Sequence, residues 1–67
     1  MGKQYFNIQE VSEYLGISVN TLYEWVHRRM IPFHKFGKSV RFEKSDIDNW
    51  AKGCRIEAVN VELIHSN

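Results

Sequence analysis

Apolar residues recur at helical spacing early in the chain, and the first stripe, at intervals of three and four, consists of Ile8, Val11 and Leu15. Such a stripe is typical of a helix with one face on a core. Asn7 precedes it as an N-cap, and Glu10 stands where its side chain can complete a capping box. Gly16 is suited to the left-handed conformation that ends a helix. These residues predict a helix between Asn7 and Gly16.

The helical pattern restarts at Ser18, which can cap a second helix running to about Arg28 or Arg29. Its apolar side carries Val19, Leu22, Trp25 and Val26. Its other side carries Asn20, Tyr23, Glu24, His27 and Arg28. Pro32 prevents the helix from continuing.

The segment 31–42, IPFHKFGKSVRF, predicts a short two-stranded hairpin with its tip near residues 37–39. Gly37 suits the positive backbone angle of such a turn. The alternation predicts that the core side of the hairpin carries Phe36, Val40 and Phe42. A third helix is expected to begin at Ser45, with Asp48 as its capping partner, and to end at Gly53.

These elements predict a small core made of Val11, Leu15, Leu22, Trp25, Val26, Phe36, Val40, Phe42, Ile47 and Trp50. A chain of 67 residues forms one domain at most, and we expect it to cover residues 1–54. Residues 55–67 form a tail whose apolar spacing fits both a helix and a strand.

Only Gly16 and Ile17 separate the first helix from the Ser18 cap, so the two helices must cross steeply. That is the geometry of a helix-turn-helix unit, whose second helix enters the DNA major groove. The alternative is that Gly16 is a simple C-cap within a small helical core.

The polar side of the second helix carries side chains that can recognise bases. Asn20 could pair with adenine, Glu24 could accept a hydrogen bond from cytosine, and Arg28 could reach guanine or a phosphate. The same side offers two aromatic groups, Tyr23 and His27. Each of these residues alone is also an ordinary solvated side chain.

Phosphate contacts are expected at the start of the second helix and along the hairpin. Ser18 and Thr21 could bond phosphates where the helix dipole favours an anion. The hairpin would contribute Lys35, Gly37, Lys38, Ser39 and Arg41. The alternative is a plain surface hairpin whose lysines serve solubility and protect the strand edge.

The distribution of charge favours a polyanionic partner, although the net charge is only +1. Between Arg28 and Lys44 there are six basic residues against one acidic residue, whereas the rest of the chain has three basic and seven acidic residues. Such an asymmetry can give one face a positive potential.

The order and spacing of QEVSEYLGIS, NTLYEW, IP and GKSVRFEKSDIDNW, covering about residues 5–51, resemble the excisionase-type helix-turn-helix domains, relatives of the MerR-like winged helices. The resemblance implies a mainly α-helical winged helix-turn-helix with a small β-hairpin. It also implies that the 19–29 helix is the recognition helix and that the hairpin is the wing. Arg28 and Arg29 stand where the family often has glycine at the end of the recognition helix.

The resemblance further implies a non-catalytic protein that binds double-stranded DNA, as an excisionase-like architectural factor in site-specific recombination or as a transcriptional regulator. A recombinase or another copy of the chain is a further expected partner. The competing hypothesis is a protein-interaction module that docks a recombinase, or self-associates, through its tail. A small enzyme is a third hypothesis.

No catalytic, metal or cofactor site is expected from the sequence. The histidines and the single cysteine, at positions His27, His34, His65 and Cys54, lack a compact zinc-ligand spacing. No base can be argued for Cys54, and no phosphate-binding glycine loop or small-molecule substrate is indicated. No membrane span or signal peptide is evident, so we expect a cytoplasmic protein. The resemblance implies that it is DNA-associated and of bacterial or phage type.

Overall fold

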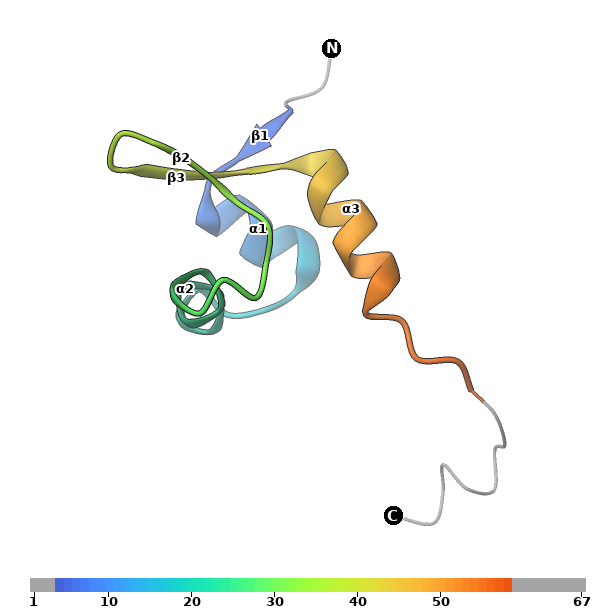
Figure 1. Ribbon diagram of the computed structural model, residues 1–67. Helices are drawn as coiled ribbons and strands as arrows, with labels where there is room; N and C mark the ends of the chain where they lie inside the picture. The colour runs from blue at the N-terminus through green and yellow to red at the C-terminus, as the bar shows by residue number, and fades with distance from the viewer. Residues whose placement is uncertain (1–3, 59–67) are drawn as a thin grey trace.

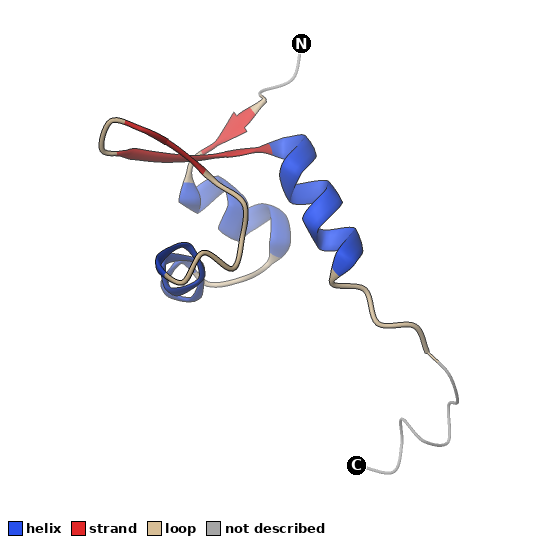
Figure 2. Cartoon of the chain, viewed as in Figure 1, coloured by secondary structure: helices blue, strands red, loops and turns tan. Residues whose placement is uncertain are grey.

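The computed structural model describes residues 4–58, which contain three helices and three short strands (Figures 1 and 2). In chain order the elements are β1 (Tyr5–Phe6), α1 (Ile8–Leu15), α2 (Val19–His27), β2 (His34–Phe36), β3 (Ser39–Glu43) and α3 (Lys44–Gly53). This is a winged helix-turn-helix, and the predicted fold class is confirmed. Residues 55–58 form no regular structure, and the rest of the tail lies outside the described residues.

The starts of α1 and α2 are capped as the sequence predicts. The Oδ1 atom of Asn7 accepts from the Glu10 amide at 2.8 Å, and Glu10 Oε1 accepts from the Asn7 amide at 2.8 Å. At the second cap, Ser18 Oγ accepts from the Thr21 amide at 3.2 Å. Each cap satisfies N–H groups that have no acceptor within the helix, so both helix starts are defined locally.

The end of α2 is unusual because Arg29 has a positive φ of 58°. The Arg29 amide donates to the Val26 carbonyl at 3.0 Å, and the Met30 amide donates to the Trp25 carbonyl at 2.8 Å. This is the pair of bonds that a Schellman motif makes, in which the left-handed residue is usually glycine. The helix ends at His27 with Arg28 as C-cap, close to the predicted end.

The hairpin pairs β2 with β3, and β1 adds a third strand on the other side of β3. Gly37, with φ 63°, lies in the two-residue turn between β2 and β3, so the predicted tip is confirmed. The pairing of Phe6 with Phe42 seats β1 over the core. A two-residue strand has no periodicity to detect, and for that reason β1 is absent from the sequence prediction.

The register corrects the predicted position of Phe36. Phe36 pairs with Ser39, whereas Lys35 pairs with Val40. Since directly paired residues point to the same face and neighbours along a strand alternate, Phe36 lies on the opposite face from Val40 and Phe42. It is 54% exposed, so its predicted place in the core is wrong.

The fully enclosed part of the core takes one side chain each from α1, α2, the loop before β2, β3 and α3: Val11, Leu22, Ile31, Phe42 and Ile47. Half-buried side chains surround it, including the predicted Leu15, Trp25, Val26, Val40 and Trp50. Trp25 and Trp50 pack with ring centroids 5.8 Å apart, and the Trp50 indole donates to the Met30 carbonyl at 3.0 Å. Ile31 is missing from the predicted core because it lies in a loop without periodicity.

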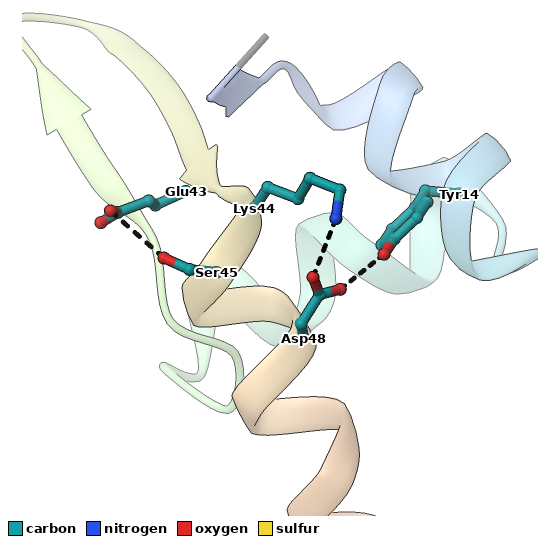
Figure 3. A network of polar contacts seen from close by, with 5 residues as sticks. All are labelled: Tyr14, Glu43, Lys44, Ser45 and Asp48. Atoms are coloured by element: carbon teal, nitrogen blue, oxygen red, sulfur yellow. Dashed lines mark hydrogen bonds and ion pairs between the residues drawn. The ribbon is translucent and has the colours of Figure 1, made fainter. Parts of the chain in front are cut away.

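The start of α3 differs from the prediction. The helix begins at Lys44, and Glu43 occupies the N-cap position without a side-chain capping bond, so the expected Ser45–Asp48 cap is wrong. Instead, Asp48 accepts from the Tyr14 hydroxyl at 2.5 Å and from Lys44 Nζ at 3.0 Å (Figure 3). The Tyr14 hydrogen bond, followed by that of Lys44, lowers the pKa of Asp48. The bond to Asp48 raises the pKa of Lys44.

Candidate nucleic-acid interface

The short turn after α1 sets α2 steeply across it. The amides of Gly16 and Ile17 both donate to the Ser12 carbonyl, at 2.8 and 3.2 Å, and Gly16 has φ 70°. In Figure 1, α2 is seen nearly end-on, whereas α1 runs across the view. The predicted steep crossing is confirmed.

The outer side of α2 is exposed along its length, and it carries Asn20, Tyr23, Glu24, His27 and Arg28. Arg28 Nη2 lies 2.8 Å from Glu24 Oε2, with side-chain exposures of 66% and 56%. An ion pair this exposed contributes little to stability. Both side chains can therefore leave each other for another polar partner at small cost.

The predicted phosphate ligands at the start of α2 are already engaged with each other. Besides accepting from the Thr21 amide, Ser18 donates its hydroxyl to Thr21 Oγ1 at 2.9 Å. Thr21 accepts in this bond and keeps its own hydroxyl proton for donation. The helix start also offers backbone N–H groups and the positive end of the dipole, which together favour an anion.

The basic residues of the wing, defined here as β2, β3 and their turn, point to different sides. Lys38 and Ser39 are exposed at the tip, next to Gly37. The register puts Lys35 on the same face as Val40, and Arg41 on the opposite face beside His34. The Arg41 guanidinium also donates to the Val40 carbonyl at 2.8 Å, which holds the side chain against the strand. The wing thus offers cations on both faces and at its tip.

A groove of about 450 Å³ lies between α2, the wing and the start of α1. Its lining includes four of the predicted site residues: Tyr23, Lys38, Ser39 and Arg41. It also includes Asn7 and Gln9, which the sequence analysis did not select. Gln9 is exposed in the first turn of α1, and nothing in its sequence position distinguishes it from any solvated residue.

The remaining predicted site residues lie outside that groove, on α2 and its two caps, on strand β2 and in the wing turn: Ser18, Asn20, Thr21, Glu24, His27, Arg28, Lys35 and Gly37. Those on the outer side of α2 are exposed. We call α2's outer side, the groove and the wing the helix–wing surface.

Among residues 4–58, one group of side chains could hold a metal ion: His34, Glu43 and Asp46. The sequence analysis missed this group because it considered only the spacing of histidines and of the cysteine, whereas two of these potential ligands are carboxylates. Cys54 is a free, exposed cysteine. Among the same residues, no helix is both long and apolar enough to cross a membrane.

Comparison with known proteins agrees with this architecture. A search among curated proteins found no match. A family model described as a helix-turn-helix domain matches residues 5–55, which include every helix and strand described above. Domains of this kind are DNA-binding and generally non-catalytic. The chain therefore belongs to the helix-turn-helix domain family, of the excisionase-like type.

Proposed function

We propose that the protein binds double-stranded DNA through the helix–wing surface, with α2 in the major groove and the wing on the phosphate backbone. In this proposal it acts as an excisionase-like architectural factor for site-specific recombination or as a transcriptional regulator. Residues 1–54 form the DNA-binding domain, and residues 55–67 are a separate tail. The setting would be cytoplasmic, in a bacterium or phage.

The observation that carries the proposal is that one groove separates the exposed polar side of α2 from two cations of the wing, with one residue of that helix side in its lining. Tyr23 of α2 lines this groove together with Lys38 and Arg41 of the wing. Asn20 and Glu24 extend the same helix surface outward. A helix in the major groove and a cationic strand pair beside it would contact adjacent parts of one duplex.

The two parts of the surface have different expected roles. Contacts to phosphates fix position and carry no direct sequence information, whereas contacts to base edges in the major groove distinguish base pairs. Lys38 at the wing tip is an expected phosphate ligand. Asn20 and Glu24 are expected to read bases, and Arg28 could do either. A single module typically buries about 600–1,000 Å² on DNA, so we expect modest affinity for one copy.

The test begins with selection of bound duplexes from a random pool, followed by titration of the selected site and a scrambled duplex across a salt series. Lys38→Ala should weaken binding to both duplexes about equally. It should also flatten the dependence of log K on log salt by about 0.9 for the lost phosphate contact. Lys52→Ala is the matched control, because Lys52 is an exposed lysine on α3, away from the wing.

Asn20→Ala should leave the salt slope nearly unchanged and reduce the preference for the selected site by about 1–3 kcal/mol. Asn49→Ala, an exposed asparagine on α3, is its control. If the wing variant alters specificity while the helix variant changes only the salt slope, the proposed docking is reversed. If neither variant differs from its control, the DNA surface lies elsewhere.

A second candidate function is a protein-interaction module, and an apolar groove on the other side of α2 favours it. This groove, of about 420 Å³, is lined by Leu15, Ile17, Trp25, Met30, Trp50, Ala51 and Cys54. Ile56, just beyond it in the chain, is 91% exposed. A recombinase or a second copy docked there would be held mainly by apolar contacts, so its binding should change little with salt, in contrast to DNA binding.

A further inference from the structure

Three side chains that are distant from the tip of the wing meet at its base. His34 is the first residue of β2, Glu43 is the last residue of β3, and Asp46 lies in the first turn of α3. One potential ligand atom from each lies within 4.8 Å of the others. All three residues are half-buried, so the cluster is both supported by the fold and open to solvent.

The two distances from His34 to the carboxylates match those between the ligands of a small divalent ion. His34 Nε2 lies 3.4 Å from Glu43 Oε1 and 3.5 Å from Asp46 Oδ2. Both separations exceed the range of an ordinary N–H···O hydrogen bond, about 2.7–3.2 Å. Ligands held at about 2.0–2.1 Å from a tetrahedral ion lie about 3.4 Å apart. The imidazole nitrogen therefore faces two carboxylates at a spacing that fits metal ligands and that also fits ion pairs with a protonated imidazole.

Neighbouring side chains hold the imidazole in this orientation. The His34 ring stacks on Phe36 with an interplanar angle of 3° and centroids 5.9 Å apart, and the Tyr5 ring meets it edge-on at 5.6 Å. These aromatic contacts lie on the outer face of the sheet. The exposed Phe36 ring therefore serves to support the imidazole of His34. Rings packed in this way restrict rotation of the ligand, as metal sites require.

The carboxylate of Glu43 is also oriented by a neighbour. Its Oε2 atom accepts from the Ser45 hydroxyl at 3.3 Å, as Figure 3 shows, while the other oxygen faces His34. A bond to the oxygen that does not bind the metal helps to orient a ligand in protein metal sites, but at 3.3 Å this one is longer than an ordinary O–H···O hydrogen bond and its contribution is small.

We propose that His34, Glu43 and Asp46 form a binding site for a divalent transition-metal ion of the Zn²⁺ type at the base of the wing. One imidazole nitrogen and two carboxylate oxygens are ligands that Zn²⁺ accepts, with water in the fourth position. The ion joins β2, β3 and α3. It also neutralises two acidic groups beside the basic wing.

The experiment is a titration of the full chain with zinc chloride near neutral pH, with the heat of binding measured by isothermal titration calorimetry. We expect one Zn²⁺ per chain. His34→Gln, Glu43→Gln and Asp46→Asn should each weaken binding by at least about tenfold, the lower end of the losses seen when even a supporting residue is removed. Circular dichroism of each variant establishes that it is folded.

Two matched variants test other potential zinc-binding side chains among residues 4–58. His27→Gln removes an exposed histidine on α2, and Cys54→Ser removes the free thiol. Neither should change zinc affinity. As a second measurement, Zn²⁺ should shift the ring resonances of His34 in NMR spectra and leave those of His27 in place.

The proposal is overturned if wild-type protein does not bind Zn²⁺ at millimolar concentration. It is also overturned if binding persists in all three ligand variants, or is lost in His27→Gln or Cys54→Ser. Because the readout involves no nucleic acid, failure here would leave the proposed DNA binding intact, and failure of DNA binding would leave this site intact.

Discussion

Replacing Arg29 by glycine should stabilise the protein, because Arg29 holds the left-handed position that ends α2. Its φ of 58° places Cβ close to the following carbonyl oxygen. For an L-residue this conformation costs about 1–2 kcal/mol, and glycine does not incur that cost. Glycine loses more backbone entropy on folding, about 0.5–1 kcal/mol relative to alanine. The net gain expected for Arg29→Gly is therefore about 0.5–1 kcal/mol.

The gain should be visible in a chemical or thermal denaturation followed by circular dichroism. In a domain of this size 1 kcal/mol corresponds to about 4–8 °C in Tm, so we expect a rise of about 2–8 °C. Arg29→Ala is the essential control, since it removes the same charge and side chain but keeps the strained conformation. Its stability should remain near that of the parent chain.

Two further variants, which should lower stability, test the same dependence on the backbone angle φ. Arg28→Gly should destabilise the protein, because Arg28 has an ordinary φ of −88° and glycine brings only the entropic cost. Gly16→Ala should cost about 1–2 kcal/mol. A Cβ at Gly16 would meet nothing within 4 Å, so that loss would come from φ alone. If Arg29→Gly proves no more stable than Arg29→Ala, the strain argument is refuted.

Two other predictions concern the core and the contact between α1 and α3. Leu22→Ala should lower the free energy of unfolding by about 2–5 kcal/mol, a large part of the stability of a small domain, whereas Tyr23→Ala should have little effect on urea denaturation. The folded-state pKa of Asp48 is lowered, so its contribution to stability is present above the unfolded pKa and is lost as pH falls through the folded one. Tyr14→Phe should move the Asp48 titration, followed by NMR, upward toward its usual midpoint; an unchanged midpoint would contradict the assigned hydrogen bond.

Local sequence signals predicted the starts of α1 and α2, the tight turn between them and the hairpin tip correctly. Each depends on residues within a few positions of one another, such as Asn7 with Glu10, or Gly37 within its turn. These interactions form with little help from the rest of the chain, so their residue types and spacing are sufficient to indicate them. Their order and spacing carried the family resemblance, and that resemblance implied the winged helix-turn-helix.

Predictions failed where the outcome depended on strand register or on a distant partner. Phe36 fits the apolar pattern of the hairpin, but pairing with Ser39 turns it to the outer face. Asp48 has the spacing of a capping residue, but the Tyr14 hydroxyl, 34 positions earlier, binds it instead. A shift of one residue in register reverses the face of every side chain, and a tip placed only near residues 37–39 leaves the register undetermined by one residue.

The sequence by itself determined where α1, the α2 cap and the wing turn would form, because those depend on local bonds and on backbone angles. The tertiary structure alone decided which side chains would share a surface. Tyr23 meets the wing, and His34 meets Glu43 and Asp46, only after β3 has paired with β2 and α3 has turned back beside them. Both candidate sites are built from residues of different elements, and their proximity is a consequence of packing that spacing along the chain does not encode.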